Sequence, residues 1–538
     1  MRQLFVYSIV FFINFNIQAQ YNVYNSLYIK EIEIVSNRLE NFVTGNRIEK
    51  IDSLSKEIFK HDNLSDVLSN LSIIPIKSYG VSGISSASIR GTNSNQMAVL
   101  WNGFNLQDPL TASLGLNLIP IQFIDDISIQ YGGSSSLFGS SAIGGVIHLN
   151  NKADFNTNTN IEFNSSYGSF NTYNTGLNLS FSNKNFNSKF RAFYKTSENN
   201  FSFINTSKYG HPEEVNQNSD VESKGFLQEN FYRFSDFSQI CSHYWYQQTY
   251  RQVPKNMSSD AGEAYQQDNW HKVAVKYYKE ILNADFYFKS GFFYNSTHYV
   301  DNEVFVDAFH SSVQTINEAE IKINLNNSNI LNFGLNNNYT QGNSESFLNK
   351  EDLNNFAGFF SYKFKSENNR IVFITSLREE VIDNQFIEPN FSIGANFILA
   401  NKFESKINFS KNFRAPTFND LFWLDAFARG NPDLKPENAY TLEIALVYSP
   451  FNQKKLLNIE FSLFYNYISD LILWQPVFNI WTPINLKENL AKGIELNMSG
   501  LAKINKFQLN YKASYSYTKS TIEKITENES ENLLHNQL

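Results

Sequence analysis

This sequence shows no cluster of nucleophiles, general bases or metal ligands of the kind that catalysis requires. The single cysteine, Cys241, cannot form an intramolecular disulfide, and the eight histidines form no H-E-x-x-H or other paired ligand pattern. No G-x-S-x-G sequence offers a serine nucleophile. One pair of hard oxygen ligands, Asp220 and Glu222, has a spacing that suits calcium. The sequence therefore predicts a binding protein and not an enzyme, with calcium as the one cofactor to consider.

The most informative stretch is residues 88–149, where short apolar runs are separated by clusters of glycine, serine and asparagine. This pattern predicts a small sheet with tight turns. The pairs Gly132-Gly133 and Gly144-Gly145 indicate backbone packed closely against other backbone. A phosphate-binding loop is a weaker interpretation, because no G-x-x-x-x-G-K-[ST] sequence is present and no helix pattern follows.

Three motifs in this stretch resemble the plug domain of TonB-dependent outer-membrane transporters. They are the IRG of residues 89–91, the NG of residues 102–103 and the glycine-serine segment of residues 132–147, in the order that the family shows. The resemblance spans roughly residues 64–150. Within the family, the IRGTN sequence of residues 89–93 is most similar to the cobalamin transporters.

The remainder of the chain shows a two-residue periodicity. From about residue 155, apolar side chains alternate with polar ones, most clearly at Ile459, Phe461, Leu463, Tyr465 and Tyr467. The chain is 16% aromatic but only 18% charged, which fits strands with one apolar face and one wet face. A soluble β-sandwich would also alternate.

The resemblance implies a membrane barrel instead. We expect a transmembrane antiparallel β-barrel of about 22 strands when complete, of which about 17 are present here, with an N-terminal α+β plug domain inside the lumen. Residues 412–422, 430–437 and 492–496 also resemble barrel signatures of the family.

The expected organisation has four parts. Residues 1–19 read as a signal peptide, with Arg2, an apolar run and Ala19 before the cleavage site. Residues 20–50 would hold the TonB-box region and linker, residues 51–153 the plug and residues 154–538 the barrel. The chain stops in a polar stretch after Tyr517. Because an open barrel would expose unpaired backbone groups to hydrocarbon, we expect an incomplete sequence rather than a defective product.

A short alternating segment precedes the plug and resembles a TonB box, the segment gripped by the energy-transducing TonB protein of the periplasm. It consists of Glu31, Ile32, Glu33, Ile34, Val35 and Ser36. An exposed extended segment of this kind can add its backbone hydrogen bonds to the edge of a partner sheet. An ordinary plug strand would have the same pattern.

The resemblance also implies which plug loops meet the ligand. The candidates carry amide, hydroxyl or carboxylate groups in two loops: Thr92, Asn93, Ser94, Asn95 and Gln96 in the first, and Asn105, Leu106, Gln107 and Asp108 in the second. Such groups can offer hydrogen bonds to a large polar ligand. The alternative is that these residues simply populate turns.

Two further site predictions concern charged side chains. Arg90 lies in an apolar strand and should not be buried without a partner, so we expect a bidentate ion pair with a carboxylate on the inner wall of the barrel. Asp220 and Glu222 lie where cobalamin transporters carry calcium-binding acidic residues. A solvated acidic loop is the alternative for this pair.

The resemblance implies active uptake across the outer membrane of a Gram-negative bacterium by a monomer in contact with outer-membrane lipid. Cobalamin is the expected cargo and a ferric siderophore the alternative. A passive porin-like channel and a soluble adhesin or lectin are alternatives from other classes, but neither explains the plug motifs. The net charge of −8 and the pI near 5.6 argue against a nucleic-acid partner.

Overall fold

The computed structural model describes residues 37–80, 83–155, 158–259, 262–450, 456–504 and 507–524. The predicted signal peptide (1–19) and TonB box (31–36) lie outside the described residues. Within them, no helix has the length and apolar character needed to cross a membrane.

The first 150 residues contain an α+β domain, hereafter the plug. Its helices are α2 (Asn37–Phe42), α3 (Ser53–Ile58), α4 (Leu64–Leu71) and α5 (Ser135–Phe138), with 3₁₀ turns η1 (Ser94–Gln96), η2 (Leu116–Leu118) and η3 (Ile121–Phe123). Its strands are β1 (Ile48–Lys50), β2 (Ile76–Ser78), β3 (Ser85–Ala87), β4 (Met97–Trp101), β5 (Phe104–Asn105), β6 (Asp126–Tyr131) and β7 (Gly145–Asn150). The main sheet has the order β1-β6-β7-β4-β5, so β1, in the region predicted as linker, is an edge strand of this sheet. Only β4 and β7 pair in parallel within it.

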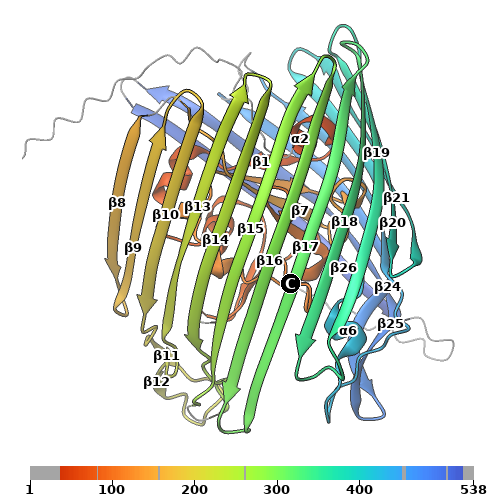
Figure 1. Ribbon diagram of the computed structural model, residues 1–538. Coiled ribbons are helices and arrows are strands. Elements are labelled where there is room, and N and C mark those ends of the chain that lie inside the picture. The colour runs from red at the N-terminus through yellow and green to blue at the C-terminus, as the bar shows by residue number, and fades with distance from the viewer. Residues whose placement is uncertain are drawn as a thin grey trace, which may run out of the picture. The chain divides into compact units, whose positions relative to one another are not determined.

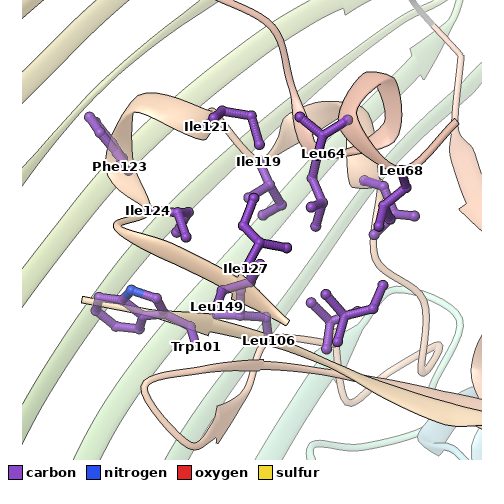
Figure 2. Packing of buried hydrophobic residues seen from close by; sticks show 14 of the residues in the cluster. Leu64, Leu68, Trp101, Leu106, Ile119, Ile121, Phe123, Ile124, Ile127 and Leu149 are labelled. Carbon is purple, nitrogen blue, oxygen red and sulfur yellow. The ribbon is translucent and has the colours of Figure 1, made fainter. Parts of the chain in front are cut away.

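Helix α4 follows the helical spacing of apolar residues at positions 64, 67, 68 and 71 of the sequence. Leu64, Val67 and Leu68 share one buried face, and Asn63 and Asp66 form a reciprocal capping box at the N-terminus. Figure 2 shows Leu64 of this helix next to Ile119, in the apolar cluster that also contains Leu68, Ile127 and Trp101. The same cluster also includes Trp245 and Phe293 from the long strands described next, so the core of the plug continues into its contact with those strands.

The plug lies inside a wall of long strands (Figure 1). The wall strands are β8 (Thr159–Gly168), β9 (Thr172–Ser182), β10 (Phe186–Ser197), β13 (Val221–Ser235), β14 (Ser238–Gln252), β15 (Tyr265–Ile281), β16 (Ala284–Asp301), β17 (Val306–Asn324), β18 (Asn329–Ser344), β19 (Glu351–Lys365), β20 (Ile371–Ile382), β21 (Gln385–Ala400), β22 (Phe403–Arg414), β23 (Glu437–Tyr448), β24 (Asn458–Val477), β25 (Ile480–Ile504) and β26 (Phe507–Lys524). These 17 strands form a closed barrel in sequence order, and consecutive strands pair antiparallel. The barrel-and-plug fold predicted from the sequence is confirmed.

The alternation along each strand separates an outer from an inner face. On β24, Phe461, Leu463 and Tyr465 are exposed on the outside, while Ser462 and Asn466 are buried on the inside. The outer face is therefore apolar and the inner face largely polar, as expected of a barrel that lies in lipid and encloses a polar interior.

The two ends of the barrel differ. The longest connections, residues 198–220 and 415–436, lie at one end and contain the hairpin β11 (Ser202–Ile204) and β12 (Glu213–Val215) and helix α6 (Phe418–Phe422). Figure 1 places β11, β12 and α6 together at its lower end. At the other end the connections are mostly short turns, such as residues 236–237 and 282–283. Because outer-membrane barrels have long extracellular loops and short periplasmic turns, the end with α6 is the outer end.

The plug backbone approaches the wall closely at residues 44–45. Gly45 has a φ of +80°, its N–H donates to Asn396 Oδ1 at 2.9 Å, and a Cβ there would lie 2.0 Å from the carbonyl oxygen of Ile407. A Cβ on Gly394 of β21 would lie 2.3 Å from the carbonyl oxygen of Thr44. This contact requires glycine on both sides.

Candidate functional site: the contact of plug and barrel and its two cavities

Arg90 of the plug is paired with two carboxylates of the wall. Its Nε and Nη2 donate to the two oxygens of Glu495 at 2.9 Å each, and Nη2 also donates to Glu443 Oε1 at 2.8 Å. All three side chains are at least 96% buried. Burial alone would lower the pKa of the Arg90 guanidinium, but the two glutamates raise it above its ordinary value. The sequence predicted a carboxylate partner, and the register of β23 and β25 supplies a pair of them.

Asp125, just before β6, makes a second charged contact with the wall. Arg191 Nη2 donates to its Oδ1 at 2.7 Å and Lys189 Nζ to its Oδ2 at 3.1 Å, while the backbone N–H of Lys152 adds a bond at 3.0 Å. Burial alone would raise the pKa of Asp125, but the two cations lower it below its ordinary value.

Arg38 of helix α2 makes the third charged contact between the plug and the wall. Its Nε and Nη2 donate to Glu320 Oε2 at 2.9 and 2.7 Å, Nη2 also pairs with Glu318, and Nη1 donates to the carbonyl oxygen of Leu137 at 2.8 Å. Both glutamates belong to β17. Arg38 follows the predicted TonB box by two residues in the sequence, so the first described helix is tied to the wall.

A cavity of about 380 Å³, hereafter the first cavity, lies between the plug and the wall. It extends from the connection 415–436 at the outer end down to Arg38. Its wall side carries carboxamides: Gln314, Asn336, Asn338, Asn355 and Gln385. The three cations in its lining are each paired with a carboxylate, Arg38 and Lys289 with Glu318 and Arg378 with Glu380. The cavity thus offers neutral hydrogen-bonding groups, and each of its lining cations is paired with a carboxylate.

The two loops predicted to meet the ligand have different surroundings in the structure. In the second loop, Asn105, Gln107 and Asp108 line the first cavity, and burial raises the pKa of the Asp108 carboxyl despite a hydrogen bond from the N–H of Leu110. Leu106 instead belongs to the apolar core.

The first loop touches the second, because Gln107 Nε2 donates to the carbonyl oxygen of Ser94 at 3.4 Å, but the side chains of Thr92 and Gln96 lie within the protein and not in the first cavity. Thr92 is buried and donates to the carbonyl oxygen of Ile89 at 2.7 Å, and buried Gln96 donates to Glu437 Oε2 of β23 at 2.7 Å. The neighbouring residues Asn93, Ser94 and Asn95 line neither this cavity nor the one described next. The polar groups of Thr92 and Gln96 are thus already used within the protein.

A second cavity of about 400 Å³ lies on the other side of the plug. It is lined by residues of the plug, among them residues 60–63, and by the outer parts of β9, β10, β13 and β14. Lys195 of β10 and Arg251 of β14 are the wall cations in this lining. Neither cation was among the predicted site residues. The alternation on β14 could have indicated Arg251, because it shares the inward parity of Trp245 and Thr249.

Asp220 and Glu222 lie at the outer end of the barrel. Glu222 of β13 pairs with Lys224 at 3.1 Å and accepts a hydrogen bond from the hydroxyl of Tyr194 at 3.4 Å, and the backbone N–H of Asp220 donates to Gln252 Oε1 at 3.0 Å. Over the described ranges, no three His, Cys, Asp or Glu side chains are placed to hold a metal ion together. Calcium binding at this pair stays a prediction.

A folded domain docked inside an antiparallel barrel with long loops at one end defines a plugged outer-membrane barrel. The family profile described as "TonB dependent receptor-like, beta-barrel" matches residues 105–536, and the profile of the "TonB-dependent Receptor Plug Domain" matches residues 47–146. The chain therefore belongs to the TonB-dependent receptor family, whose members are outer-membrane proteins of Gram-negative bacteria.

Relatives in this family carry more than one cargo name. The chain is 26% identical over 479 residues to the "Vitamin B12 transporter BtuB" of Vibrio vulnificus strain YJ016, a match that covers 84% of this chain and 74% of the relative. The FrpB iron transporter of Neisseria meningitidis superposes with a TM-score of 0.75 at 13% identity, covering 90% of this chain and 81% of that structure. The siderophore receptor PirA of Acinetobacter baumannii superposes with a TM-score of 0.71 at 15% identity, covering 89% and 84%. At these identities the structural matches establish the fold alone.

The family defines the general function. TonB-dependent transport across the outer membrane is the activity of its members, and they are transporters and receptors, not enzymes.

Proposed function

We propose that this protein imports a large, uncharged ligand rich in amide groups, of the cobalamin class, with energy supplied through TonB. The observation that carries the proposal is the lining of the first cavity. Amide side chains of the wall, such as Asn338 and Gln385, line a space that reaches the outer loops. A carboxamide can donate and accept at once, so it matches the carboxamides at the edge of a corrin ring.

The paired charges of the first cavity argue in the same direction. A ferric siderophore that carries net negative charge would gain most from unpaired arginine or lysine side chains. Here Arg38, Lys289 and Arg378 already share their charge with glutamates. The similarity to a vitamin B12 transporter over 84% of the chain supports the same cargo. A ferric siderophore is the second candidate, because structures named for iron and siderophore transport share this fold.

Energy would enter through the segment that precedes α2. A pull on residues 31–36 would first load the ion pairs of Arg38 with Glu318 and Glu320, because these tie α2 to the wall. Their separation would free the deep end of the first cavity, which Arg38 lines. A passive channel needs no such connection, and the lumen here holds a folded plug.

The test is ligand binding to outer membranes that contain the protein. Cyanocobalamin should bind, and a ferric catecholate and a ferric hydroxamate should bind at least tenfold more weakly. N338A should weaken cyanocobalamin binding about tenfold, because one or two neutral hydrogen bonds are lost. N337A is the matched control. Asn337 directly precedes Asn338 in β18, but its side chain donates a hydrogen bond to Asn354 and does not line the cavity.

Two outcomes would contradict the proposal. Tighter binding of either siderophore would reassign the cargo. Uptake that persists without TonB would assign a passive channel. Loss of uptake with unchanged binding in cells lacking TonB is the expected result.

A further inference from the structure

We propose that the second cavity is a binding site for an oxyanion, a phosphate or carboxylate group, with Arg251 as its principal ligand. The group is either a free ion or part of the transported ligand. The inference rests on the proposed function if the oxyanion is part of the transported ligand, and is independent of it if the oxyanion is a free ion. The proposal concerns a different face of the plug from the amide-lined first cavity.

The second cavity lies towards the outer end of the barrel. Its wall side is formed by Thr172, Ser197 and Ser223 near the outer ends of β9, β10 and β13, and by Thr249 and Arg251 near the outer end of β14. A ligand that arrives at the outer end would therefore meet these side chains before it meets the deeper contacts of plug and wall.

Arg251 is buried with an incomplete set of partners. Its residue exposure is 5%, and its Nη2 lies 3.4 Å from Asp268 Oδ2. Its Nε and Nη1 have no hydrogen-bond partner among the residues that the structure describes. Asp268 is also engaged elsewhere, because its Oδ1 accepts from Gln266 Nε2 and Thr297 Oγ1 at 2.8 Å each. A buried guanidinium with unpartnered N–H groups loses stability that an acceptor oxygen would restore.

The rest of the wall side suits an oxyanion as well. Lys195 adds a second cation, and the hydroxyls of Thr249 and Ser223 lie 2.9 Å apart and form a pair beside Arg251. Arginine, lysine and hydroxyl donors together are the groups that bind phosphate and carboxylate oxygens in proteins. The plug side bears Asp62, Asp66, Lys60 and His61; Asp66 is used to cap α4, and Lys60 is paired with Glu57 and Glu162. The anion would thus lie against the wall and not against the plug.

The contrast with the first cavity supports this assignment. There every lining cation is paired with a carboxylate through a contact of ordinary ion-pair length or shorter. At Arg251 the single carboxylate lies at 3.4 Å and leaves two nitrogens without partners in the described part of the chain. The missing partner is therefore best supplied by a ligand.

The experiment is a calorimetric titration of the purified, full-length protein in detergent with inorganic phosphate, and separately with acetate. Wild type should bind at least one of the two anions. R251Q should weaken that binding about tenfold to a hundredfold, because hydrogen bonds to a charged group are lost. The matched control is K224Q, which removes one positive charge at the same end of the barrel, from a side chain that pairs with Glu222. K224Q should change the affinity less than twofold.

Two additional variants guard against loss of folding. R251Q/D268N removes both charges, so no carboxylate is left unpaired, and T249V/S223A keeps Arg251 while removing the hydroxyl pair. Both should weaken anion binding. Two results would overturn the proposal. The first is an equal anion affinity in wild type and R251Q/D268N. The second is that wild type binds neither anion and R251Q binds cyanocobalamin as tightly as wild type.

The same variants distinguish the two sources of the oxyanion. Cyanocobalamin carries a phosphodiester, so weaker cyanocobalamin binding by R251Q places the group on the cargo. Weaker phosphate binding with unchanged cyanocobalamin binding assigns a free anion. Failure of wild type to bind cyanocobalamin would contradict the proposed cargo but leave the anion titration valid.

Discussion

Replacement of Arg90 by methionine should detach the neighbouring part of the plug from the wall. The substitution keeps a long apolar stem but leaves Glu443 and Glu495 facing each other, both at least 96% buried. Three charge-assisted hydrogen bonds are lost, and only Arg47, at 3.3 Å from Glu495, remains to compensate. Removal of one partner from a buried ion pair costs about 3–5 kcal/mol. We expect a loss of plug docking free energy in this range.

Hydrogen exchange of the plug measures this loss directly. Amides of residues 85–101 should exchange about a hundredfold to a few thousandfold faster in R90M, since each factor of ten corresponds to about 1.4 kcal/mol. The triple variant R90M/E443Q/E495Q removes the unpaired charges and should recover most of the protection. Exchange in R90M within threefold of wild type would refute the reasoning, as would a triple variant that exchanges faster than R90M.

Three further predictions use the same measurement. R38Q should speed exchange in residues 38–47 by a similar factor, because it leaves the buried Glu320 without its ion-pair partner, while Glu318 keeps Lys289. E40Q breaks an exposed pair and should change the exchange rate less than about fivefold. Docking of the plug around Asp125 should be independent of pH above about pH 4 and weaken as the pH falls below it. The reason is that the folded-state pKa of this carboxyl is depressed and protonation removes its ion pairs. D125N should abolish that pH dependence. G45A should cost about 1–3 kcal/mol of docking through its clash with wall backbone, while G80A, with φ of +90° but open space around it, should cost about 1 kcal/mol. Equal effects of G45A and G80A would contradict the close approach to the wall.

The outer face of the barrel and the helix α4 could be predicted from local pattern. Phe461, Leu463 and Tyr465 contact the lipid side because alternation at period two reports burial directly. Asn63 and Leu64 mark the start of α4 because the capping group and the apolar spacing agree. Both features depend on neighbours in the sequence, so a single chain contains the information.

The roles of side chains on the inner face could not be predicted from the local sequence pattern. Polar side chains such as Asn338 and Arg251 line the lumen at positions whose pattern resembles that of a solvated strand face. The partners of Arg90 lie 353 and 405 residues away, and only the register of the closed wall brings them together. The orientation of the plug likewise decides that Gln107 meets a cavity and Gln96 meets the wall, although both occur in polar turns.

The chemistry of the contact between plug and wall has a mechanical consequence. Arg38, Arg90 and Asp125 hold the plug through hydrogen bonds and charges, and each of these groups can form equivalent bonds with water once a gap opens. Elsewhere the contact is apolar, because Trp101, Phe104 and Phe123 of the plug pack against the wall residues Trp245, Phe293 and Phe193, respectively. Solvent can therefore take over the charged groups once a gap opens beside them, whereas exposure of the aromatic part to water is unfavourable and drives the two surfaces back together when the force ends.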